Sequence, residues 1–389
     1  MDSAEFRDSP SGFLVPTTGE AKAFVPNPLP PSLQLDPLIG LLTEATGYLG
    51  ELRGIGRTLP NPYLLIRPFQ RREAVASSII EGTVTSLSDL LMLEAGADER
   101  ERLPDTREVF NYVRALEHSL ERLQELPVCI RLFNEAHSIL LTGVRRHRGA
   151  VITPGEFKRE QNWIGGESIA DARFVPCPPH EVWPAMDQLE KYIQFETAFP
   201  LLIRLALIHY QFETIHPYPD GNGRVGRLLI PLILAEKGEM PQPLLYLSPF
   251  FERRRRDYID HLYEVSRSGA WYEWVCFFLS GVIEQCRDTV ERIQRLQDLQ
   301  MRYHRRLQQA RSSAATLQLA DHLFERPYIT VPSAQKVLCI KTYRGAKHIV
   351  DRLLQEEILV PVSSETRPKV FLAPEIFTIV QGDFDQGNA

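Results

Sequence analysis

The stretch that most constrains the fold of this chain is HPYPDGNGRVGR, from His216 to Arg227. It interrupts two apolar segments of helical periodicity, LLIRLALIHYQFETI before it and the run over about 224–237 after it. By letter, GNGRVG matches the GxGxxG pattern of dinucleotide-binding folds, but that pattern requires a preceding strand within a βαβ unit. Helices on both sides exclude that fold and predict a glycine-rich loop that opens the N-terminus of a helix.

Helical periodicity continues through most of the chain, which predicts a mainly α fold with a short β-hairpin flap. The proline-rich residues 1–35 are expected to be extended or disordered, and residues 36–126 to form a helical domain. A core that contains the glycine-rich loop is expected over 127–270. Connecting helices over 271–311 and a separate domain over 312–389 complete the predicted organisation.

The C-terminal segment has the pattern of three short helices followed by two strands, LVPVSS and KVFLA, which is the order of a winged helix-turn-helix. Cations that can meet DNA phosphates lie along its third helix, at Lys341, Arg344, Lys347 and Arg352. Carboxylates follow closely, at Asp351, Glu356 and Glu357. We therefore expect a partner-binding or dimerising module in preference to DNA contact, and a DNA-binding regulator with a nucleotide-sensing core stays as the rival function.

Bulk properties exclude several classes of protein. The formal charge of -6 and the pI near 6.0 give no overall basis for coating nucleic acid or binding a membrane surface. The N-terminus lacks a basic segment followed by an apolar run, and the apolar stretch LLIPLILA is too short to span a bilayer. We expect a soluble, cytoplasmic protein. The five cysteines are scattered, without the CxxC spacing of a zinc or redox site.

The glycine-rich loop carries the residue types of a phosphate site. Gly221 and Gly223 allow a phosphate to approach the backbone at a helix N-terminus, where unpaired amides and the helix dipole favour an anion. Arg224 and Arg227 lie one helical turn apart, and we expect both to be free to engage two phosphate groups of one ligand. This spacing suits a triphosphate.

Two further side chains of the loop can drive a reaction on such a phosphate. Asp220, directly before the glycines, offers a hard oxygen ligand for a Mg²⁺ ion that bridges phosphate oxygens. His216 offers a neutral imidazole that can take the proton from an attacking hydroxyl. Each residue alone also fits a structural turn, but the convergence of these roles within one short loop favours an active site.

The stretch HPYPDGNGRVGR resembles the Fic family motif HPFx[D/E]GNGRxxR, with Tyr218 where the family usually has Phe. The segments GVRRHRGAVITPGEFKREQNWIGG and YLSPFFERRRRDYIDHL are similar to the family's flap and to the helix after its core. The resemblance implies a mainly helical fold and transfer of AMP from ATP to Ser, Thr or Tyr hydroxyls of a target protein, with Mg²⁺ as cofactor. The roles it implies are general base for His216, Mg²⁺ ligand for Asp220, anion hole for Gly221, Asn222 and Gly223, phosphate clamp for Arg224 and γ-phosphate partner for Arg227.

Two positions bear on the branch of the family and on its nucleotide. The Doc branch, which phosphorylates, has Lys in place of Gly223, so this chain resembles the AMP-transferring branch. Arg254 stands where the family often has Asn near the adenine, so the motif does not fix the choice of base. Removal of AMP, transfer of another nucleotide, self-modification and homodimer formation stay open as alternatives or additions.

Ser77 and Glu81 lie four residues apart, on one face of an expected helix that Gly82 ends. By spacing alone they fit a solvated polar pair. However, SSIIEG resembles the inhibitory motif [S/T]xxxE[G/N] of Fic proteins with an N-terminal inhibitory helix. The resemblance implies that Glu81 pairs with Arg227, occupies the place of the γ-phosphate and lowers activity. A role of Glu81 in positioning water to remove AMP is a second interpretation.

The segment rich in glycine and aromatic residues before the core helices predicts an irregular hairpin, the flap. Its expected target-docking residues are Asn162, Trp163, Ile164 and Gly165. An extended segment of the target could pair with this hairpin by strand addition and bring its hydroxyl to the base. The alternative is a structural loop whose Trp163 and Ile164 only cover the core.

Overall fold

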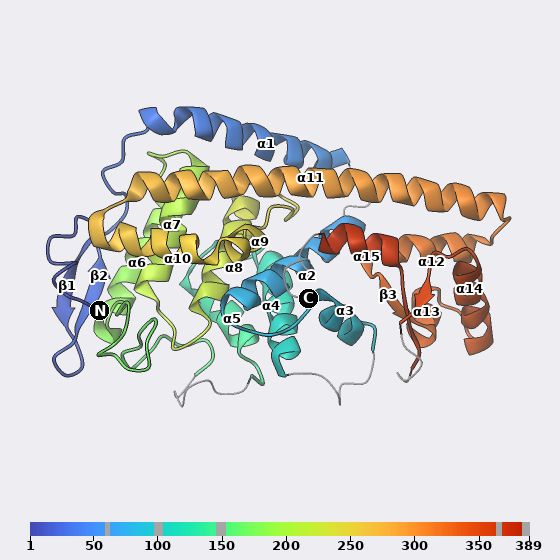
Figure 1. Ribbon diagram of the computed structural model, residues 1–389, viewed down its shortest axis with the longest axis horizontal. Helices are drawn as coiled ribbons and strands as arrows, with labels where there is room; N and C mark the ends of the chain where they lie inside the picture. The colour runs from blue at the N-terminus through green and yellow to red at the C-terminus, as the bar shows by residue number, and fades with distance from the viewer. Residues whose placement is uncertain (59–62, 97–103, 145–152, 363–367, 383–389) are drawn as a thin grey trace.

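A computed structural model describes residues 1–58, 63–96, 104–144, 153–362 and 368–382 of the chain. These residues form a mainly helical architecture with small antiparallel sheets, as predicted (Figure 1). None of the described helices combines the length and the apolar character needed to cross a membrane.

The first helices form the N-terminal layer. They are the 3-10 turn η1 (Asp36–Leu38), α1 (Ile39–Thr58), α2 (Tyr63–Ile80), α3 (Leu87–Glu94) and α4 (Pro104–Arg122). Gly82 lies two residues after the end of α2 with a φ of 91°, a left-handed conformation that ends the helix as expected. Ser86 caps α3 in a reciprocal capping box with Asp89.

The core is built from α5 (Ile130–Leu140), α6 (Pro179–Phe195), α7 (Leu201–Ile215), α8 (Asn222–Glu236), α9 (Ser248–Arg253) and α10 (Arg255–Ser268). Helices α7 and α8 are buried around almost their whole circumference and pack against each other. A helix that is apolar on every side belongs in the centre of a domain. The loop between these two central helices is therefore held on a rigid base.

One continuous helix, α11 (Trp271–Gln309), occupies the segment predicted as connecting helices. At 1.5 Å per residue its 39 residues span roughly 58 Å. Helix α1 lies along α11, and the far end of α11 reaches the C-terminal domain (Figure 1). The long helix thus joins the core to the last domain without a flexible linker.

The start of the chain is extended only in part: residues 3–8 form turns, and an antiparallel hairpin of β1 (Gly12–Pro16) and β2 (Lys22–Pro26) follows. Gly12 pairs with Pro26 and Pro16 with Lys22. Phe6 and Phe24 lie in one buried aromatic cluster with Phe174, a residue from the flap region. The hairpin is anchored by this contact with a segment distant in sequence.

The C-terminal domain contains α12 (Ala314–Glu325), β3 (Tyr328–Thr330), α13 (Val331–Val337), α14 (Tyr343–Gln355), β4 (Val360–Pro361), β5 (Val370–Leu372) and α15 (Pro374–Gln381). Its three strands form an antiparallel sheet of order β3-β5-β4. The three helices and the two late strands follow the predicted order, and α15 was not anticipated. Assignment of this domain as a winged helix stays a prediction.

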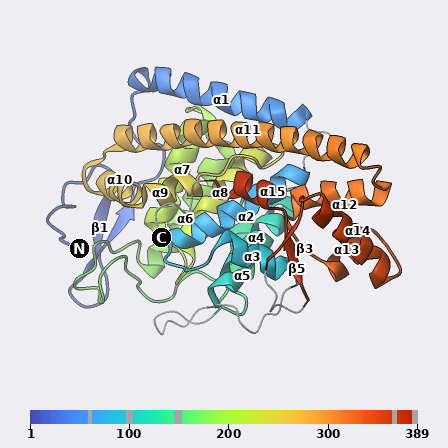
Figure 2. The ribbon, with the colours of Figure 1, turned by 45° about the vertical axis from the view of Figure 1, so that its right-hand side comes forward.

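Helix α2 lies between the core and the C-terminal domain (Figure 2). On one side it contacts α4, α8 and α9, and on the other it contacts α12 and α15. Arg67 of α2 forms an ion pair with Glu325 of α12, and Arg72 pairs with Asp288 of α11 at 2.6 Å. The helix that carries Ser77 is therefore clamped from both sides.

Candidate active site

The glycine-rich loop turns through two left-handed residues. Helix α7 ends at His216, whose φ is 52°, and α8 begins after Gly221, whose φ is 77°. A left-handed residue other than glycine is uncommon and costs conformational energy, so its presence at His216 marks a position that the surrounding structure fixes. The loop directs His216 and the N-terminus of α8 into one site.

Side-chain amides brace this loop. Asn222 accepts from the Tyr218 amide through Oδ1 at 2.7 Å and donates through Nδ2 to the Tyr218 carbonyl at 2.7 Å. Asn162 of the flap donates to the same carbonyl at 2.9 Å, and its own Oδ1 accepts from Lys158 Nζ at 2.7 Å. The side chains of Asn222 and Asn162 therefore hold the loop in shape.

Tyr218, the departure from the family motif, is fully buried. Its hydroxyl donates to Asn134 Oδ1 at 2.7 Å, and its ring stacks on His137 with 3.9 Å between the centroids. His137 Nδ1 accepts from the Gly155 amide, so Nε2 carries the proton and donates to the Asp220 carbonyl at 3.0 Å. The polar tip of Tyr218 has a partner, and the substitution preserves the packing of the loop.

His216 has the protonation state of a base. Its Nδ1 faces the Glu213 carbonyl at 3.2 Å, and because a carbonyl can only accept, Nδ1 carries the proton and Nε2 has a free lone pair. Burial, followed by the charge of Lys158, lowers the pKa of His216 to about 4. The imidazole is therefore neutral at neutral pH and able to accept a proton from a hydroxyl.

The anion position at the start of α8 is already occupied by a carboxylate. A Cβ built on Gly223 would lie only 2.1 Å from Glu81 Oε1, so any side chain at position 223 would collide with Glu81. Glu81 follows the last turn of α2, while Gly223 lies in the first turn of α8. The carboxylate thus takes the place that the helix dipole and the free amides favour for an anion.

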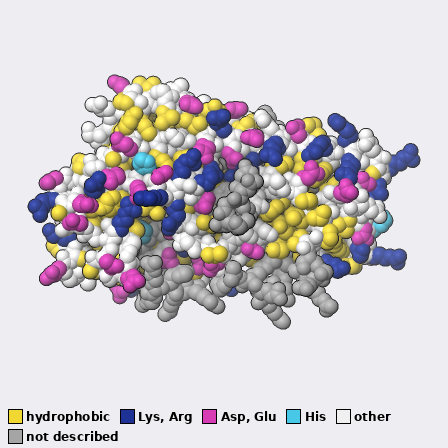
Figure 3. All heavy atoms as spheres, in the orientation of Figure 1, with side chains coloured by type: hydrophobic (Ala, Val, Ile, Leu, Met, Phe, Trp, Pro, Cys, Tyr) yellow, Lys and Arg dark blue, Asp and Glu magenta, His cyan; other side chains and the backbone are white. Residues whose placement is uncertain are grey.

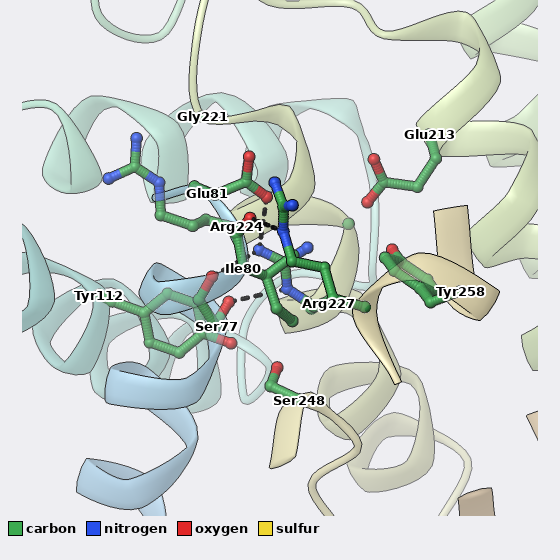
Figure 4. A network of polar contacts seen from close by, with 12 residues as sticks. Ser77, Ile80, Glu81, Tyr112, Glu213, Gly221, Arg224, Arg227, Ser248 and Tyr258 are labelled. Atoms are coloured by element: carbon green, nitrogen blue, oxygen red, sulfur yellow. Dashed lines mark hydrogen bonds and ion pairs between the residues drawn. The ribbon is translucent and has the colours of Figure 1, made fainter. Parts of the chain in front are cut away.

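Arg227 is the centre of the contact between α2 and α8 (Figure 4). Its Nη2 donates to Glu81 Oε1 at 2.7 Å and to the Ser77 carbonyl at 2.7 Å, and its Nε donates to Ser77 Oγ at 2.9 Å. We call Ser77, Glu81 and Arg227 the Arg227 cluster. The structure thus brings Arg227 into contact with Ser77, from which it is 150 positions away in the sequence.

The charges in the Arg227 cluster are unequally exposed. The Arg227 side chain is 2% exposed and that of Glu81 is 37% exposed. Burial raises the pKa of Glu81, but the attraction of Arg227 and Arg224 outweighs it and holds the pKa below its ordinary value. Burial raises the pKa of Glu213, on the other side of Arg227, to about 8 (Figure 4). The neutral form of Glu213 is therefore favoured, and Glu81 is the anionic partner of Arg227.

The expectation that Arg224 is free was wrong, whereas the pairing of Arg227 with Glu81 was expected. Arg224 is 2% exposed, and its Nη1 donates to Glu108 Oε2 of α4 at 2.9 Å. Its Nη2 also reaches Asp220 Oδ1 at 3.5 Å. A buried guanidinium needs a counter-charge, and the N-terminal layer supplies one to each arginine.

Asp220 fits a Mg²⁺ ligand that acts together with a nucleotide. Its side chain is 29% exposed, and Oδ1 accepts from the Gly221 amide at 2.6 Å. Among the described residues no group of three or more His, Cys, Asp or Glu side chains could form a protein-only metal cage. Mg²⁺ characteristically uses one or two carboxylates plus substrate phosphates, so a single carboxylate beside the anion position suits it.

The flap forms the predicted irregular hairpin around one antiparallel bridge. The Ile164 amide donates to the Phe174 carbonyl at 2.8 Å, and the Phe174 amide donates back at 3.1 Å. Gly165 follows with a φ of 71°. Trp163 and Ile164 pack partly against the hairpin of the first 26 residues. Residues 145–152 of the expected flap lie outside the described residues.

Arg254, at the position where the family often has Asn, is engaged away from the loop. Its Nη2 donates to Glu284 of α11 at 2.8 Å, and its guanidinium lies 4.4 Å from the centroid of the Phe250 ring. The next residue, Arg255, donates to the Ile80 carbonyl at the end of α2 at 2.8 Å. Through Arg255, helix α10 therefore contacts the segment that carries Glu81.

Three residues in the site were missed by sequence reasoning: Glu108, Lys158 and Arg255. Glu108 contacts Arg224, and Arg255 contacts Ile80. Lys158 contacts Asn162, which in turn donates to the Tyr218 carbonyl. No local spacing marks such pairs. Glu108 is one of several charged residues of the amphipathic helix α4, so the sequence did not mark it as buried.

Comparison with known proteins follows this geometry. Residues 39–121 match the Fic/DOC family N-terminal domain, and residues 127–234 match the Fic/DOC family domain. A probable protein adenylyltransferase of Aquifex aeolicus is 40% identical over 70 residues, which cover 18% of this chain and 22% of that protein. The protein adenylyltransferase Fic of Drosophila melanogaster is 31% identical over 121 residues, 31% of this chain and 22% of that protein. The matched region thus spans about a fifth of the length of these relatives.

Solved structures share the fold. A Fic family protein from Desulfovibrio desulfuricans aligns with a TM-score of 0.57 at 19% identity, over 89% of this chain and 98% of that chain. A Fic domain containing signaling protein from Bacteroides thetaiotaomicron aligns with a TM-score of 0.52 at 20% identity, over 64% and 96%. With the N-terminal layer, the glycine-rich loop and both matches in agreement, this chain contains the Fic/DOC family N-terminal domain and the Fic/DOC family domain.

Proposed function

We propose that this chain is a protein adenylyltransferase that moves AMP from ATP to a Ser, Thr or Tyr hydroxyl of a protein. The observation that carries the proposal is the neutral His216 beside the anion position at the start of α8. The Fic/DOC family domain and relatives named protein adenylyltransferases support it. Because a side chain at position 223 would collide with Glu81, the Gly223 of this loop also favours the AMP-transferring branch.

In the proposed reaction the phosphates of ATP lie against the first amides of α8. His216 Nε2 takes the proton of the target hydroxyl, whose oxygen then forms a bond to the α-phosphorus while the bond to the pyrophosphate oxygen breaks. Asp220 would hold Mg²⁺, which neutralises phosphate charge when bound. Arg224 and Arg227 add fixed positive charge on the same side of the loop.

We also propose that the Arg227 cluster keeps the enzyme inactive. Glu81 lies where the γ-phosphate would need to lie to reach Arg227, so ATP can bind only in a displaced pose. Departure of Glu81 frees both Arg227 and the amides of α8. The partial exposure of the Glu81 side chain supports this view, because a carboxylate near solvent can leave at lower cost than a buried one.

For the target protein, we propose docking along the flap. Asn162 joins the flap directly to the loop that holds His216, so a strand added to the flap would have a fixed register to the base. Ile164 also packs against the aromatic cluster, so a polar or charged side chain there would disturb the fold. We therefore choose Ile164→Ala as the test, and its melting curve must be compared with that of wild type. Full transfer by a stable Ile164→Ala variant would argue against docking here.

The experiment uses a cell lysate, the purified Glu81→Gly variant and ATP labelled at either the α- or the γ-phosphate. From α-labelled ATP we expect protein labelling that is absent with the Glu81→Gly/His216→Ala double variant, and from γ-labelled ATP no labelling above the level that this double variant gives. Labelling from γ-labelled ATP that requires His216 would instead indicate phosphorylation by this enzyme. Labelling that survives His216→Ala would remove the base from the mechanism.

A further inference from the structure

The second and third helices of the C-terminal domain lie in contact and are joined by a short turn, which is the element order of a helix-turn-helix. Helix α13 contacts α14 through a five-residue turn, 338–342, in which Cys339 adopts a left-handed φ of 52°. Thr342 caps α14 by accepting from the Gly345 amide at 3.2 Å. The apolar face of α14 is buried in the domain through Ala346, Ile349, Val350 and Leu353. Its opposite face is exposed to solvent.

That exposed face is basic. Along the first two turns of α14 it presents Tyr343, Arg344 and Lys347, all exposed, and Lys341 in the preceding turn is exposed as well. Lys336 lies at the end of α13 and is also exposed. We call this surface the α14 face. Figure 3 shows Lys and Arg side chains projecting from the end of the molecule that α12 to α14 form.

The carboxylates of the domain do not neutralise the α14 face. Lys347 pairs with Asp351 one turn later, but among the described residues Lys336, Lys341 and Arg344 form no ion pair. Each of the six described carboxylates of the domain has a cationic or histidine partner, and for five of them at least one such partner lies on α2 or α11. The pairs are Asp321 with His304, Glu325 with Arg67, His322 and Arg326, Asp351 with Lys347, Glu356 with Arg306 and Arg352, Glu357 with Arg306, and Glu375 with Arg302.

From this segregation of charge we infer that the α14 face binds double-stranded DNA, with α14 in the major groove. The width of that groove, about 12 Å, admits one helix, and in a helix-turn-helix the N-terminal residues of the second helix meet the base edges. Arg344 and Tyr343 hold those positions, while Lys341 and Lys336 lie beside them for phosphate contact. The inference is independent of the proposed AMP transfer.

This inference reverses the preference for a protein partner drawn from the sequence. That preference counted Asp351, Glu356 and Glu357 against DNA, whereas Glu356 and Glu357 are engaged by Arg306 of α11. Protein interfaces are depleted of lysine and built around apolar anchors. The α14 face offers one large apolar side chain, Tyr343 at 55% exposure, among its cations. Its composition therefore suits a polyanion.

The test is fluorescence anisotropy with the full chain and a labelled mixed-sequence duplex of about 30 base pairs, long enough for the footprint of one helix-turn-helix. For nonspecific contact we expect Kd values in the range of about 10⁻⁶ to 10⁻⁴ M, and log K that falls against log salt with a slope of about -3 for three or four phosphates. Lys341→Glu/Arg344→Glu should weaken binding at least about tenfold and reduce the slope by about 2. The matched control is Arg256→Glu, a 93% exposed arginine on α10, which should change neither value.

Lys341→Gln/Arg344→Gln is the second variant, because it removes charge without adding any, and thermal melting verifies that each variant is folded. Binding that is absent at low salt would overturn the inference. Unchanged affinity in both double variants would overturn it as well. Equal, equally mutation-sensitive binding of polyglutamate would mean adsorption of any polyanion and would also refute recognition of DNA.

Discussion

Removal of Glu81 is the perturbation that most directly probes the Arg227 cluster. Position 81 lies in the turn after α2, with its amide donating to the Ser78 carbonyl at 3.1 Å, so a glycine there removes little helical structure. Glu81→Gly clears the carboxylate from above Gly223 and frees one donor of Arg227, which keeps its two contacts with Ser77. Glu81→Gln removes the charge and keeps the volume.

The size of the effect follows from the geometry of the pair. Two unit charges about 4 Å apart attract by about 4 kcal/mol at the effective dielectric constant of a protein surface. Because the Glu81 side chain is 37% exposed, we reduce this to about 2 kcal/mol, which corresponds to a factor of about 30 in the population with Arg227 free. We therefore expect Glu81→Gly to transfer label about 30-fold faster than wild type, and Glu81→Gln to lie between them.

The assay is the initial rate of label incorporation from α-labelled ATP at saturating Mg²⁺. Glu20→Gly is a matched control, since Glu20 is an exposed glutamate in a hairpin turn, and it should label at the wild-type rate. If Glu81→Gly labels no faster than Glu20→Gly while both variants are folded, the Arg227 cluster does not restrain the enzyme. A Glu81→Gln rate equal to that of Glu81→Gly would mean that charge alone, and not volume, blocks the site.

Three further predictions concern the loop and its supports. The pKa of His216 lies near 4, below the ordinary 6.5, so the imidazole is deprotonated above about pH 4. The transfer rate of Glu81→Gly should therefore stay level from pH 8 to about 5. A fall in rate centred near pH 6.5 would contradict this assignment of the base. Tyr218→Phe removes the 2.7 Å bond to Asn134 and should lower the free energy of unfolding in urea by about 1 kcal/mol; no change would show that this bond adds nothing. Glu108→Gln leaves the buried Arg224 without its full counter-charge and should lower the free energy of unfolding by about 3 kcal/mol. The loss should be smaller in a Glu108→Gln/Arg224→Gln double variant. Equal losses of unfolding free energy in the single and double variants would contradict the coupling of this pair.

Much of the candidate site could be predicted from local sequence patterns. The order of residues within HPYPDGNGRVGR was enough to predict a loop between two helices, because glycine, proline and asparagine have strong local conformational preferences. The four-residue spacing of Ser77 and Glu81 predicted a shared helical face, and both side chains contact Arg227. Features set by adjacent residues are readable because one or two turns of chain determine them.

Features that depend on contacts between distant residues could not be predicted from the sequence. Nothing near Arg224 indicates that Glu108 of α4 is its partner, because this contact depends on how two helices pack. The proline-rich start was not identified as a hairpin, since its stability comes from the contacts of Phe6 and Phe24 with Phe174. The segment after residue 270 was expected to form several helices and is one, because burial against α1 and α7 sustains it.

The most direct test of the central claim is mass spectrometry of proteins from a lysate incubated with the Glu81→Gly variant, ATP and Mg²⁺. We predict peptides that carry the mass of one AMP on a Ser, Thr or Tyr side chain, fewer of them with wild type, and none with the Glu81→Gly/His216→Ala variant. Peptides that gain phosphate in place of AMP only when His216 is present, or AMP adducts that persist without His216, would contradict transfer of AMP by this site.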